Sequence, residues 1–499
     1  MNQRFDNLTI FEMANNHQGS VEHGLSIIQA VGKLARSHDI HAAVKLQYRD
    51  LDSFIHPDFK GRDDVKHIPR FESTRLSEPE FRTLVEAMRE QSLTSVVTPF
   101  DEPSVEQCLD HGVDILKVAS CSAKDWPLLE AIADANRPVI ASTGGLSLYE
   151  IDNLVSFFMH AGTEFALMHC VALYPTPNER VSVNFLGKLC RRYPYLTVGY
   201  SGHEAPDNLE VGQMAISKGA RMLERHVGLP TDTITLNNYS MSPQEADTWL
   251  DAIARAKAIC GTDDQKHTTQ PEIDSLLSLQ RGVFAARPIK KGEAMTREDV
   301  FFAMPPSEGQ TTSGEFGQYR ASYVASKDYE ERAAIYERNQ PDDMHVIRGV
   351  VHDTKGLLYE AGIHLGEEFD IEISHHYGMH HFRQTGAVIV SCFNREYCKK
   401  LIMMLPGQKH PNHKHIKKEE TFQVLWGDLE VTRNNDEVFN LKPGDHLLVQ
   451  RGNWHRFTTR NGVIFEEVST TAYKNDSHYE DEAIAKLDPM ERKTILEDF

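Results

Sequence analysis

The sequence is poor in cysteine, and its few cysteines lie far apart. Seven cysteines occur in 499 residues, without a CxxC pair: Cys108, Cys121, Cys170, Cys190, Cys260, Cys392 and Cys398. An odd, scattered set is typical of reduced thiols in a cytosolic protein and argues against a disulfide framework. We therefore expect a cytoplasmic protein without structural disulfides.

Long apolar runs are also missing. No stretch approaches the 18 apolar residues that indicate a membrane-spanning helix. The opening residues, MNQRFDNLTIFEM, contain no basic region followed by an apolar run. We therefore expect neither a signal peptide nor contact with a membrane.

Positive charge is in deficit. The chain has 53 Lys and Arg against 73 Asp and Glu, for a formal net charge of −20. Nucleic-acid binding needs a basic surface, so we expect no nucleic-acid partner. An anionic small substrate is compatible with this charge, because a local cluster of Lys, Arg and metal can reverse the potential inside a cleft. With 40% hydrophobic and 25% charged residues the composition is globular, and the length predicts two to three domains.

Short apolar runs alternate with segments of helical period over the first 230 residues. There are eight such runs, at 8–14, 42–47, 95–100, 114–119, 138–143, 165–170, 196–201 and 220–226. Alternation of this kind predicts βα units around a parallel sheet, and eight units fit a (β/α)8 TIM barrel over residues 1–265. A doubly wound α/β sheet is the alternative, but the glycine-rich phosphate loop that usually follows an early strand of that fold is missing.

Almost every run ends in a residue that can bind a ligand or do chemistry. These residues are Glu12, Lys45 with Gln47, Thr98, Lys117 with Ser120, Ser142 with Thr143, His169, Ser201 with His203, and Glu224 with His226. Catalytic residues of a barrel gather at the C-terminal ends of its strands. A single polar strand end is more often structural, but eight in phase favour an active site.

Two lysines and three hydroxyls in this set favour an anionic substrate. Lys45 and Lys117, with Thr98, Ser120 and Ser201, would form a cationic, hydroxyl-lined pocket. Such a pocket suits a phosphate together with a carboxylate, held by charge-assisted hydrogen bonds.

Two histidines and one acid complete the candidate site. His203 and His226 follow consecutive strands, so their imidazoles can converge on one divalent metal; the alternative is a pair that only holds loops. Glu12 is the candidate carboxylate for acid/base chemistry or for steering a metal-bound water.

Eight segments resemble the ordered motifs of the sialic acid synthase (N-acetylneuraminate synthase) family: FEMANNHQGS, VKLQYR, TPFD, ILKVAS, ASTGG, MHCVALYPTP, VGYSGHE and LERHVGL. The resemblance covers roughly residues 5–300 and keeps the order and spacing of the motifs. It implies an enzyme that condenses phosphoenolpyruvate with an open-chain aldose to a 2-keto-3-deoxy sugar acid. It also implies a divalent metal in the barrel, Mn or Mg.

The same resemblance implies roles for individual residues. Phosphoenolpyruvate would be held by Lys45, Thr98, Lys117, Ser120 and Ser201. The metal would be held by His203 and His226, and Glu12 would serve the acid/base step. The sugar would be faced by Gln47 and Tyr174, with Ser122 and Asn237 nearby.

Three positions depart from the family pattern. Ser122 replaces an acid after the strand-4 serine, Ala172 replaces an asparagine, and Asn237 replaces an aspartate eleven residues after the second metal histidine. Because asparagine cannot act as a base, the metal-bound water or the sugar hydroxyl must be handled differently. These changes predict a different acceptor aldose, one without an N-acetyl group. Loss of activity is the competing interpretation.

A polar break at 261–274 follows the predicted barrel. Residues 281–305 then resemble the start of the antifreeze-like (SAF) domain that follows such barrels, and we assign 275–320 to a partial SAF-like segment and linker. In relatives this domain covers the active site of a dimer partner. The resemblance therefore implies a homodimer or a higher homo-oligomer.

The C-terminal third has the spacing of a cupin domain, which we place at 340–475, with a helical tail at 476–499. Two glycine-rich motifs contribute His413, His415, Glu420 and His455. An HxH pair puts two imidazoles on the same side of one strand, and the other two residues arrive from neighbouring strands. Three His and one Glu suit a second divalent metal, Mn, Fe, Ni or Zn. A weaker signal comes from the two histidine pairs at 375–376 and 380–381, which would line the barrel mouth or lie on an exposed polar strand or hairpin.

A cupin fused to a sugar-acid synthase is expected to act on the same sugar. The cupin looks like lyxose isomerase-type domains, which favours aldose–ketose isomerisation. A non-catalytic sugar-binding or dimerising domain and an oxygen-using dioxygenase are the alternatives. For the whole protein, the non-enzymatic alternative is a barrel retained as a sugar-binding scaffold.

Overall fold

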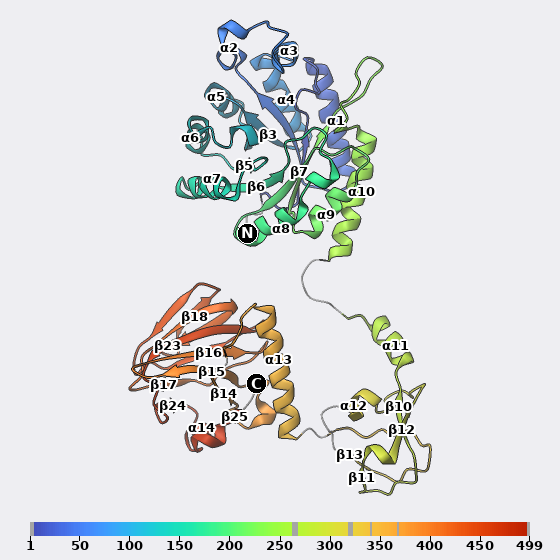
Figure 1. Cartoon of the computed structure of the whole chain (residues 1–499), viewed down its shortest axis with the longest axis vertical. Coiled ribbons are helices and arrows are strands. Elements are labelled where there is room, and N and C mark those ends of the chain that lie inside the picture. Colours follow the sequence, from blue (N-terminus) through green and yellow to red (C-terminus); the bar gives the residue numbers. More distant parts are fainter. Residues whose placement is uncertain (1–3, 262–267, 318–322, 340–341, 367–368, 497–499) are drawn as a thin grey trace. The chain divides into compact units, whose positions relative to one another are not determined.

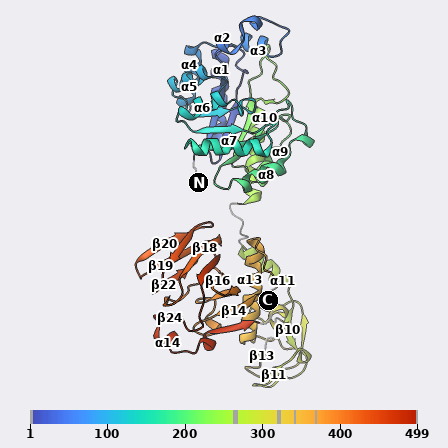
Figure 2. The ribbon, with the colours of Figure 1, turned by 60° about the vertical axis from the view of Figure 1, so that its left-hand side comes forward.

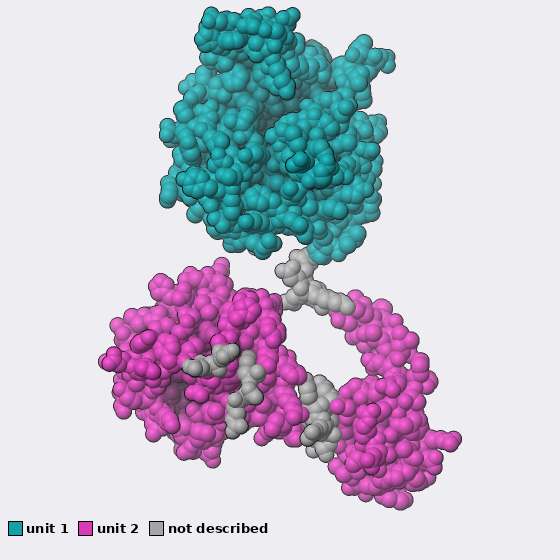
Figure 3. Space-filling view, viewed as in Figure 1, with its two compact units in different colours: residues 1–266 teal, residues 267–499 magenta. Residues whose placement is uncertain are grey.

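The computed structural model describes residues 4–261, 268–317, 323–339, 342–366 and 369–496. The chain divides into two compact units, residues 1–266 and 267–499, which are coloured separately in Figure 3. Among the described residues, no helix combines the length and the apolar character needed to cross a membrane.

The first unit is a closed barrel of eight parallel strands with alternating helices, as predicted. The strands are β1 (Leu8–Glu12), β2 (Ala42–Tyr48), β3 (Thr94–Pro99), β4 (Ile115–Val118), β5 (Val139–Ser142), β6 (Phe165–Cys170), β7 (Val198–Gly202) and β8 (Met222–Val227). Each strand pairs with the next, and β1 pairs with β8, which closes the sheet. Figures 1 and 2 show the helices arranged around the strands. The (β/α)8 prediction is confirmed.

The main helices of the barrel are α1 (Val21–Ser37), α4 (Glu78–Glu90), α5 (Glu102–Asp110), α6 (Trp126–Asp134), α7 (Leu148–His160), α8 (Val183–Arg192), α9 (Glu210–Ser217) and α10 (Pro243–Cys260). Helix α4 shows why they form where they do. Ser77 and Glu80 make a capping box at its start, which satisfies backbone N–H groups of the first turn. Its buried side chains follow the helical period, at Phe81, Leu84, Val85 and Met88. The helix therefore buries one apolar stripe in the core cluster that it shares with barrel strands.

The inside of the barrel changes character along each strand. Toward the N-terminal ends of the strands, the inside is filled by an apolar plug formed by Phe5, Leu8, Ile10, Ala43, Val96, Ile115, Ile140, Ala166, Met168 and Met222. Because side chains alternate between the two faces of a strand, the next inward positions after this plug are two residues further on. On β1, for example, Ile10 is followed inward by Glu12. The plug thus supports a polar layer at the C-terminal strand ends.

The connection after β2 is long and carries its own short elements. It contains α2 (Leu51–Phe54), the 3-10 turn η1 (Pro57–Phe59) and α3 (Ile68–Ser73) before α4 begins. A small cluster of Leu51, Ile55 and Ile68 packs inside it. This connection starts at the C-terminal end of β2, on the side of the barrel where functional residues gather.

The second unit begins with α11 (Gln270–Leu279) and a small β region. Strand β10 (Gly282–Ala285) pairs with β12 (Val300–Ala303), and β11 (Ala294–Met295) pairs with β13 (Tyr323–Val324). Helix α12 (Ser313–Gly317) lies between β12 and β13 in sequence. The apolar core of this region extends from Val283 to Ile335. The packed core of this region therefore reaches beyond the segment expected at 275–320, as far as Ile335.

The cupin region consists of two antiparallel sheets. One contains β21 (His446–Val449), β18 (Glu420–Gly427), β23 (Val463–Thr470), β16 (Tyr397–Met404), β15 (Ala387–Asn394), β14 (Asp370–Ser374) and β25 (Lys493–Leu496), in that order. The other contains β20 (Glu437–Leu441), β19 (Leu429–Arg433), β22 (His455–Thr458), β17 (His413–His415) and β24 (Ser477–Tyr479). Phe422, Phe457 and Phe465 share the core between the sheets, and α13 (Asp343–Glu360) packs through Leu357 and Leu358 on a second cluster.

The segment predicted as a helical tail, 476–499, has a different structure in its described part. It contains only one short α-helix, α14 (Glu482–Ala485), between β24 and β25, and both strands belong to the cupin sheets. Strand β25 pairs with β14, whose backbone groups would otherwise lie unpaired at the sheet edge. Lys493 also pairs with Glu372 of β14 at 2.9 Å. The helical prediction for this segment is wrong because a long-range partner decides its conformation.

Candidate functional site

Strand register brings the predicted residues of the barrel to one level. Glu12 of β1 stands opposite Lys45 on β2 and opposite His226 on β8. On the other side of β8, Ser201 of β7 stands opposite Glu224. Lys45, Lys117, Thr98 and Ser201 are buried together with Glu12.

Two glutamates neutralise the two lysines. Lys45 Nζ lies 2.5 Å from Glu12 Oε2 and donates to Glu224 Oε1 at 2.7 Å. Lys117 Nζ donates to the other oxygen of Glu224 at 2.8 Å, and the Ser201 hydroxyl donates to Oε1 at 2.8 Å. Glu224 is therefore the centre of the cluster. The pocket was expected to be cationic because of Lys45 and Lys117. It also contains two carboxyl groups, those of Glu12 and Glu224, which balance the two lysines.

Sequence reasoning placed Glu224 at a strand end without giving it a role. The available signal was its position two residues before His226, which puts both side chains on the inner face of β8. Its partners on β2 and β4 could not be deduced from spacing, because they depend on the closure of the barrel.

Burial and pairing shift the pKa values of these groups in different directions. Burial raises the pKa of Glu12, despite the opposing charge of Lys45. Burial would also raise the pKa of Glu224, but the charges of Lys117 and Lys45 outweigh it and hold that pKa low. Burial lowers the pKa of Lys117, whereas for Lys45 the two carboxylates overcome burial and raise it. Glu12 is thus the acid of the cluster best suited to hold a proton.

The hydroxyl residues line the same end of the barrel. Ser120 follows β4 in the 3-10 turn η2 (Ser120–Ser122), and its Oγ accepts from the Gly144 N–H at 3.0 Å and lies 3.0 Å from Cys170 Sγ. A Cβ at position 144 would lie 2.7 Å from that Oγ and 2.8 Å from Cys170 Sγ, so a larger residue there would displace these two side chains. Thr98 stands opposite Gln47 in the register of β2 and β3.

His203 and His226, the predicted metal ligands, lie next to each other at the strand ends of β7 and β8. Their ring centroids lie 5.4 Å apart. His203 Nδ1 lies 2.9 Å from the Val171 carbonyl oxygen. This interaction orients the ring and leaves the lone pair of Nε2 free to bind a metal. Burial lowers the pKa of both to about 3, with a further contribution from His226 on His203 and from Lys45 on His226. Both rings are therefore neutral near pH 7, the form that binds a metal.

The pair alone does not make a complete metal site. Among the described residues, no His, Cys, Asp or Glu joins His203 and His226 in a group of three close ligand atoms. The pair fits a divalent metal only as two of its ligands, so the others would come from substrate or solvent.

The four predicted sugar-facing residues differ in placement. Tyr174 is 55% exposed and its ring lies 4.2 Å from that of His203. Gln47 is half-buried on β2, and Ser122 is buried in η2. Asn237 is exposed in the loop after β8, where its Oδ1 accepts from the Tyr239 N–H at 3.1 Å.

Tyr239 itself was not anticipated from the sequence. Its ring lies 5.0 Å from that of His226 and 5.3 Å from that of Tyr174. The two tyrosines therefore form an aromatic border beside the histidine pair. No motif spacing signals Tyr239, because it reaches the site through the short strand β9 (Ser240–Met241) that pairs with β8.

The cupin contains the second predicted group. Ligand atoms of His413, His415, Glu420 and His455 all lie within 4.8 Å of one another, and all four residues are buried. His413 and His415 come from β17, Glu420 begins β18 and His455 begins β22. The HxH spacing thus places both imidazoles on one side of β17, as predicted.

The hydrogen bonds of the three histidines orient them for a metal. Each Nδ1 lies near a backbone carbonyl oxygen: Pro411 for His413 at 3.1 Å, Asp476 for His415 at 2.9 Å and Asn453 for His455 at 3.2 Å. Each Nε2 is then the atom left to face the centre. His455 Nε2 is buried and lies 2.8 Å from Glu420 Oε1. It makes no hydrogen bond among the described residues. This donor set fits a divalent transition metal.

Charged groups behind the quartet were not predicted. Lys418 Nζ lies 2.5 Å from Glu420 Oε2 and 2.7 Å from Glu467 Oε1, and all three residues are buried. Burial lowers the pKa of His415 to about 4, helped by Lys418. The pKa of Glu420 lies well below its usual value because Lys418 and His455 outweigh burial. Glu420 is thus held as a carboxylate, while His415 is neutral near pH 7, and these are the forms that bind a cation.

The quartet borders a polar cavity of about 240 Å³. Its lining includes Glu372, Lys400, Lys418, Glu467, Tyr479 and Lys493. The two histidine pairs at 375–376 and 380–381 do not form one site. His375 and His376 are buried, whereas His380 and His381 are exposed. His376 Nε2 lies 3.2 Å from His410 Nε2, and His410 lines the cavity.

Fold and site together define a barrel with a lysine–glutamate–histidine cluster at its strand ends, joined to a cupin with a metal-type quartet. The NeuB family pattern matches residues 34–265, and the cupin domain pattern matches residues 400–464. A solved structure from Chromobacterium violaceum, assigned as spore coat polysaccharide biosynthesis protein E, is 46% identical and superposes with a TM-score of 0.65, over 67% of this chain and 100% of that one. The chain belongs to the NeuB family and carries a C-terminal cupin domain.

Curated relatives of known activity are more distant. N-acetylneuraminate-9-phosphate synthase of Drosophila melanogaster is 28% identical, over 60% of this chain and 88% of the relative. N,N'-diacetyllegionaminic acid synthase of Legionella pneumophila is 24% identical (59% and 85%). Pseudaminic acid synthase of Campylobacter jejuni serotype O:2 is 26% identical (59% and 86%). These relatives are all sialic acid-type sugar-acid synthases.

Proposed function

We propose that the barrel is a sugar-acid synthase that condenses phosphoenolpyruvate with an aldose. The observation that carries the proposal is the buried cluster of Lys45, Lys117 and Glu224 beside Glu12, at the strand ends where barrel enzymes bind substrate. Sugar-acid synthase activity is also the named activity of several relatives.

In this proposal the two lysines bind the phosphate and carboxylate of phosphoenolpyruvate, together with Thr98, Ser120 and Ser201. Glu224 holds both ammonium groups in place before substrate arrives, so less side-chain ordering is needed on binding. Glu12, whose pKa is raised by burial, holds or transfers a proton beside the reacting carbons.

The reaction joins carbon 3 of phosphoenolpyruvate to the aldehyde carbon of the sugar. Water then adds at carbon 2, and phosphate leaves to give the 2-keto-3-deoxy acid. His203 and His226 would hold a divalent ion, Mn or Mg, whose contribution when bound is to polarise the aldehyde oxygen. Gln47 and Tyr174 are proposed to orient the sugar.

The acceptor is proposed to differ from N-acetylmannosamine. Ser122, Ala172 and Asn237 stand where the family pattern has other polar or acidic residues, and the Asn237 amide cannot accept a proton as a base. An aldose without an N-acetyl group fits these changes.

Phosphate release from phosphoenolpyruvate, measured with Mn or Mg against a panel of aldoses, tests the proposal. Products are identified by mass spectrometry, and Lys117→Met serves as the matched inactive variant. Release of phosphate with at least one aldose, and a product mass equal to the adduct, is the expected result. A wild-type protein that binds sugars but releases no phosphate with any of them would instead support the scaffold alternative. Better turnover of N-acetylmannosamine than of any other aldose would refute the acceptor assignment.

For the cupin we propose a metal-dependent aldose–ketose isomerase that supplies the acceptor. The supporting observation is the His413–His415–Glu420–His455 quartet at the edge of a cavity lined with charged and hydroxyl side chains. Such a lining suits a polyhydroxylated ligand. Glu467 and Lys418 stand beside the quartet as groups able to move a proton.

Conversion of ketoses to aldoses under anaerobic conditions tests this second activity. Turnover without oxygen that is lost in His413→Ala supports isomerisation. Oxygen consumption with sugar would indicate a dioxygenase, and a change only in oligomeric state or thermal stability would indicate a structural cupin.

A further inference from the structure

Arg49 extends the inward-facing row of strand β2. Ala43 belongs to the apolar plug of the barrel, Lys45 to the buried cluster, and Gln47 is a proposed sugar contact. Side chains two residues apart share one face of a strand, so Arg49 is next in this row as the chain leaves β2. It therefore lies further toward the mouth than the lysines.

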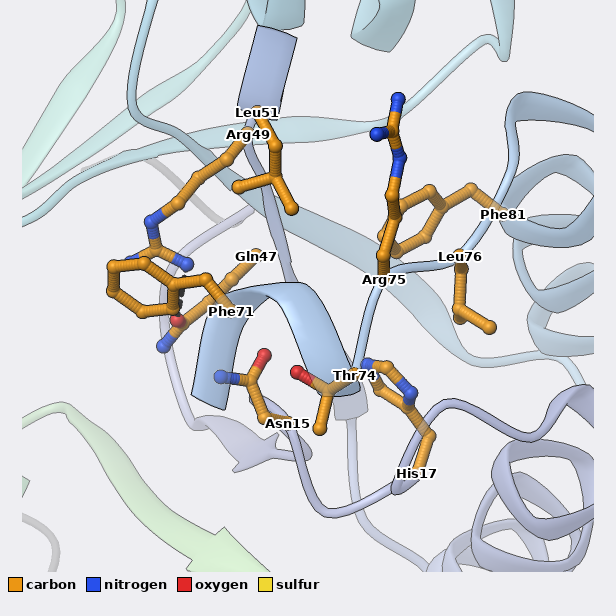
Figure 4. A pocket seen from close by; sticks show the side chains of 10 residues that line it. All are labelled: Asn15, His17, Gln47, Arg49, Leu51, Phe71, Thr74, Arg75, Leu76 and Phe81. Atoms are coloured by element: carbon orange, nitrogen blue, oxygen red, sulfur yellow. Dashed lines mark hydrogen bonds between the residues drawn. The ribbon is translucent and has the colours of Figure 1, made fainter. Parts of the chain in front are cut away.

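Aromatic rings hold the Arg49 guanidinium. Its central carbon lies 3.5 Å from the ring centroid of Phe100 and 4.2 Å from that of Phe71. One of its terminal nitrogens donates to Gln47 Oε1 at 3.1 Å. Figure 4 shows Arg49 against Phe71 at one side of a pocket that Gln47 and Asn15 also line. The planar group is thus fixed in position beside a proposed sugar contact.

The donors of Arg49 are largely unused. Its Nε is buried and has no hydrogen-bond partner among the described residues. Within those residues, no carboxylate lies within ion-pair distance of it. The acids closest to Arg49, in the sequence or by the effect of their charge, are engaged elsewhere. Glu12 pairs with Lys45, Asp101 accepts from the N–H groups of Asp50 and Ser104, and Asp50 accepts from the Ser53 hydroxyl.

An unneutralised arginine is notable in a chain with 73 acidic and 53 basic residues. Burial lowers the pKa of Arg49 to about 10, offset in part by the charges of Cys121, Glu12 and Asp101, so the guanidinium is cationic at neutral pH. A half-buried cation with free donors in a fixed plane is preorganised for a carboxylate or phosphate.

We propose that Arg49 binds an anionic group carried by the acceptor sugar, away from its aldehyde. The acceptor is then an acidic aldose, bearing a phosphate ester or a carboxylate. This inference rests on the proposed function of the barrel and specifies its substrate class. The competing role is structural, in which Arg49 only holds Gln47 and the aromatic rings in place.

The test compares acidic and neutral acceptors in wild type and three variants. The probes are hexose 6-phosphates and hexuronates, each against the parent neutral hexose. Wild type is expected to prefer one acidic series, which also identifies the anion. Arg49→Gln should reduce the acidic-to-neutral ratio of kcat/KM by about 10- to 100-fold, the scale of a lost hydrogen-bonded charge. Arg49→Lys should restore part of that ratio.

Arg75→Gln is the matched control. Arg75 lines the same pocket but is ion-paired with Asp52 at 2.7 Å, so its loss should leave the ratio unchanged. An equal loss on acidic and neutral acceptors in Arg49→Gln would overturn the proposal in favour of the structural role. A wild-type preference for neutral acceptors would overturn it too.

Failure of the proposed function is separable from failure of this inference. If wild type releases no phosphate with any acceptor, calorimetric binding of a hexose 6-phosphate and of a hexuronate still tests Arg49. At least tenfold weaker binding of one of them by Arg49→Gln, with no such loss in Arg75→Gln, would uphold the anion site. Equal binding by wild type and Arg49→Gln would overturn it.

Discussion

Lys45 of β2 and Glu224 of β8 form a buried ion pair of 2.7 Å, although 179 residues separate them in the sequence. The pair exists because the barrel closes, which brings β2 and β8 to either side of β1. A buried pair of this kind is costly to break, since removing one partner leaves the other charge unpaired.

Removing either lysine should therefore weaken phosphoenolpyruvate binding. We expect Lys45→Met and Lys117→Met each to cost about 2–4 kcal/mol in binding, because a buried charge-assisted contact is lost. Calorimetric titration with phosphoenolpyruvate measures the loss, and circular dichroism checks that each variant is folded. Unchanged affinity in both variants would place the phosphate pocket elsewhere.

The barrel reaction should depend on the histidine pair. His203→Ala and His226→Ala are each expected to lower the rate by about 100-fold or more, on the scale of losing a Lewis acid. Elemental analysis of the full chain should show a second metal besides that of the cupin, and it should be lost from both variants. Full activity of the double variant after chelation would rule out a metal at this pair.

The cupin quartet should hold its metal independently of the barrel reaction. His413→Ala is expected to remove one metal equivalent and sugar isomerisation, while condensation of phosphoenolpyruvate with a supplied aldose continues. The measurements are metal content, the two activities and sedimentation velocity on this one variant. Joint loss of both activities with a lower Tm or a broken oligomer would show that the quartet is structural.

One buried histidine, His17, should make the barrel less stable in acid. His17 is buried, its Nδ1 accepts from the Gly19 N–H, and burial with the charge of Arg70 lowers its pKa to about 4. In the unfolded chain the pKa is about 6.5. Between these values the unfolded state binds a proton that the native state does not, so the free energy of unfolding falls as pH falls, by up to about 1.4 kcal/mol per pH unit.

Replacement of His17 should reduce this slope. Urea unfolding of His17→Gln at pH 7 and pH 5 is expected to show a smaller loss of stability than wild type. The exposed His160→Gln variant is the control and should keep the wild-type slope. Equal slopes in all three proteins would contradict the assignment of His17.

Much of the site was predictable because its signals are local. The eight strands alternate with helices at the predicted places, and inward residues such as Glu12 and Lys45 fall at strand ends by the two-residue period alone. In the cupin, the HxH pair on β17 needs only one strand to bring two imidazoles together.

Other features depend on partners that are distant in sequence. The ion pairs of Glu224 and the ring contact between Tyr239 and His226 form only when separate strands come together. Strand β25 appears where a helical tail was expected because β14 offers it a sheet edge.

The sequence by itself determined the order of elements, the NeuB-type barrel, the cupin and most of the residues that line their sites, because periodicity and motif spacing are properties of neighbouring residues. Tertiary structure alone decided which charges neutralise one another: Glu224 engages both lysines, whereas Arg49 keeps free donors between two aromatic rings. The physical reason is that pairing of buried charges is set by the closure of the barrel and the packing of the loop after β2, and neither is written in the spacing of any single segment.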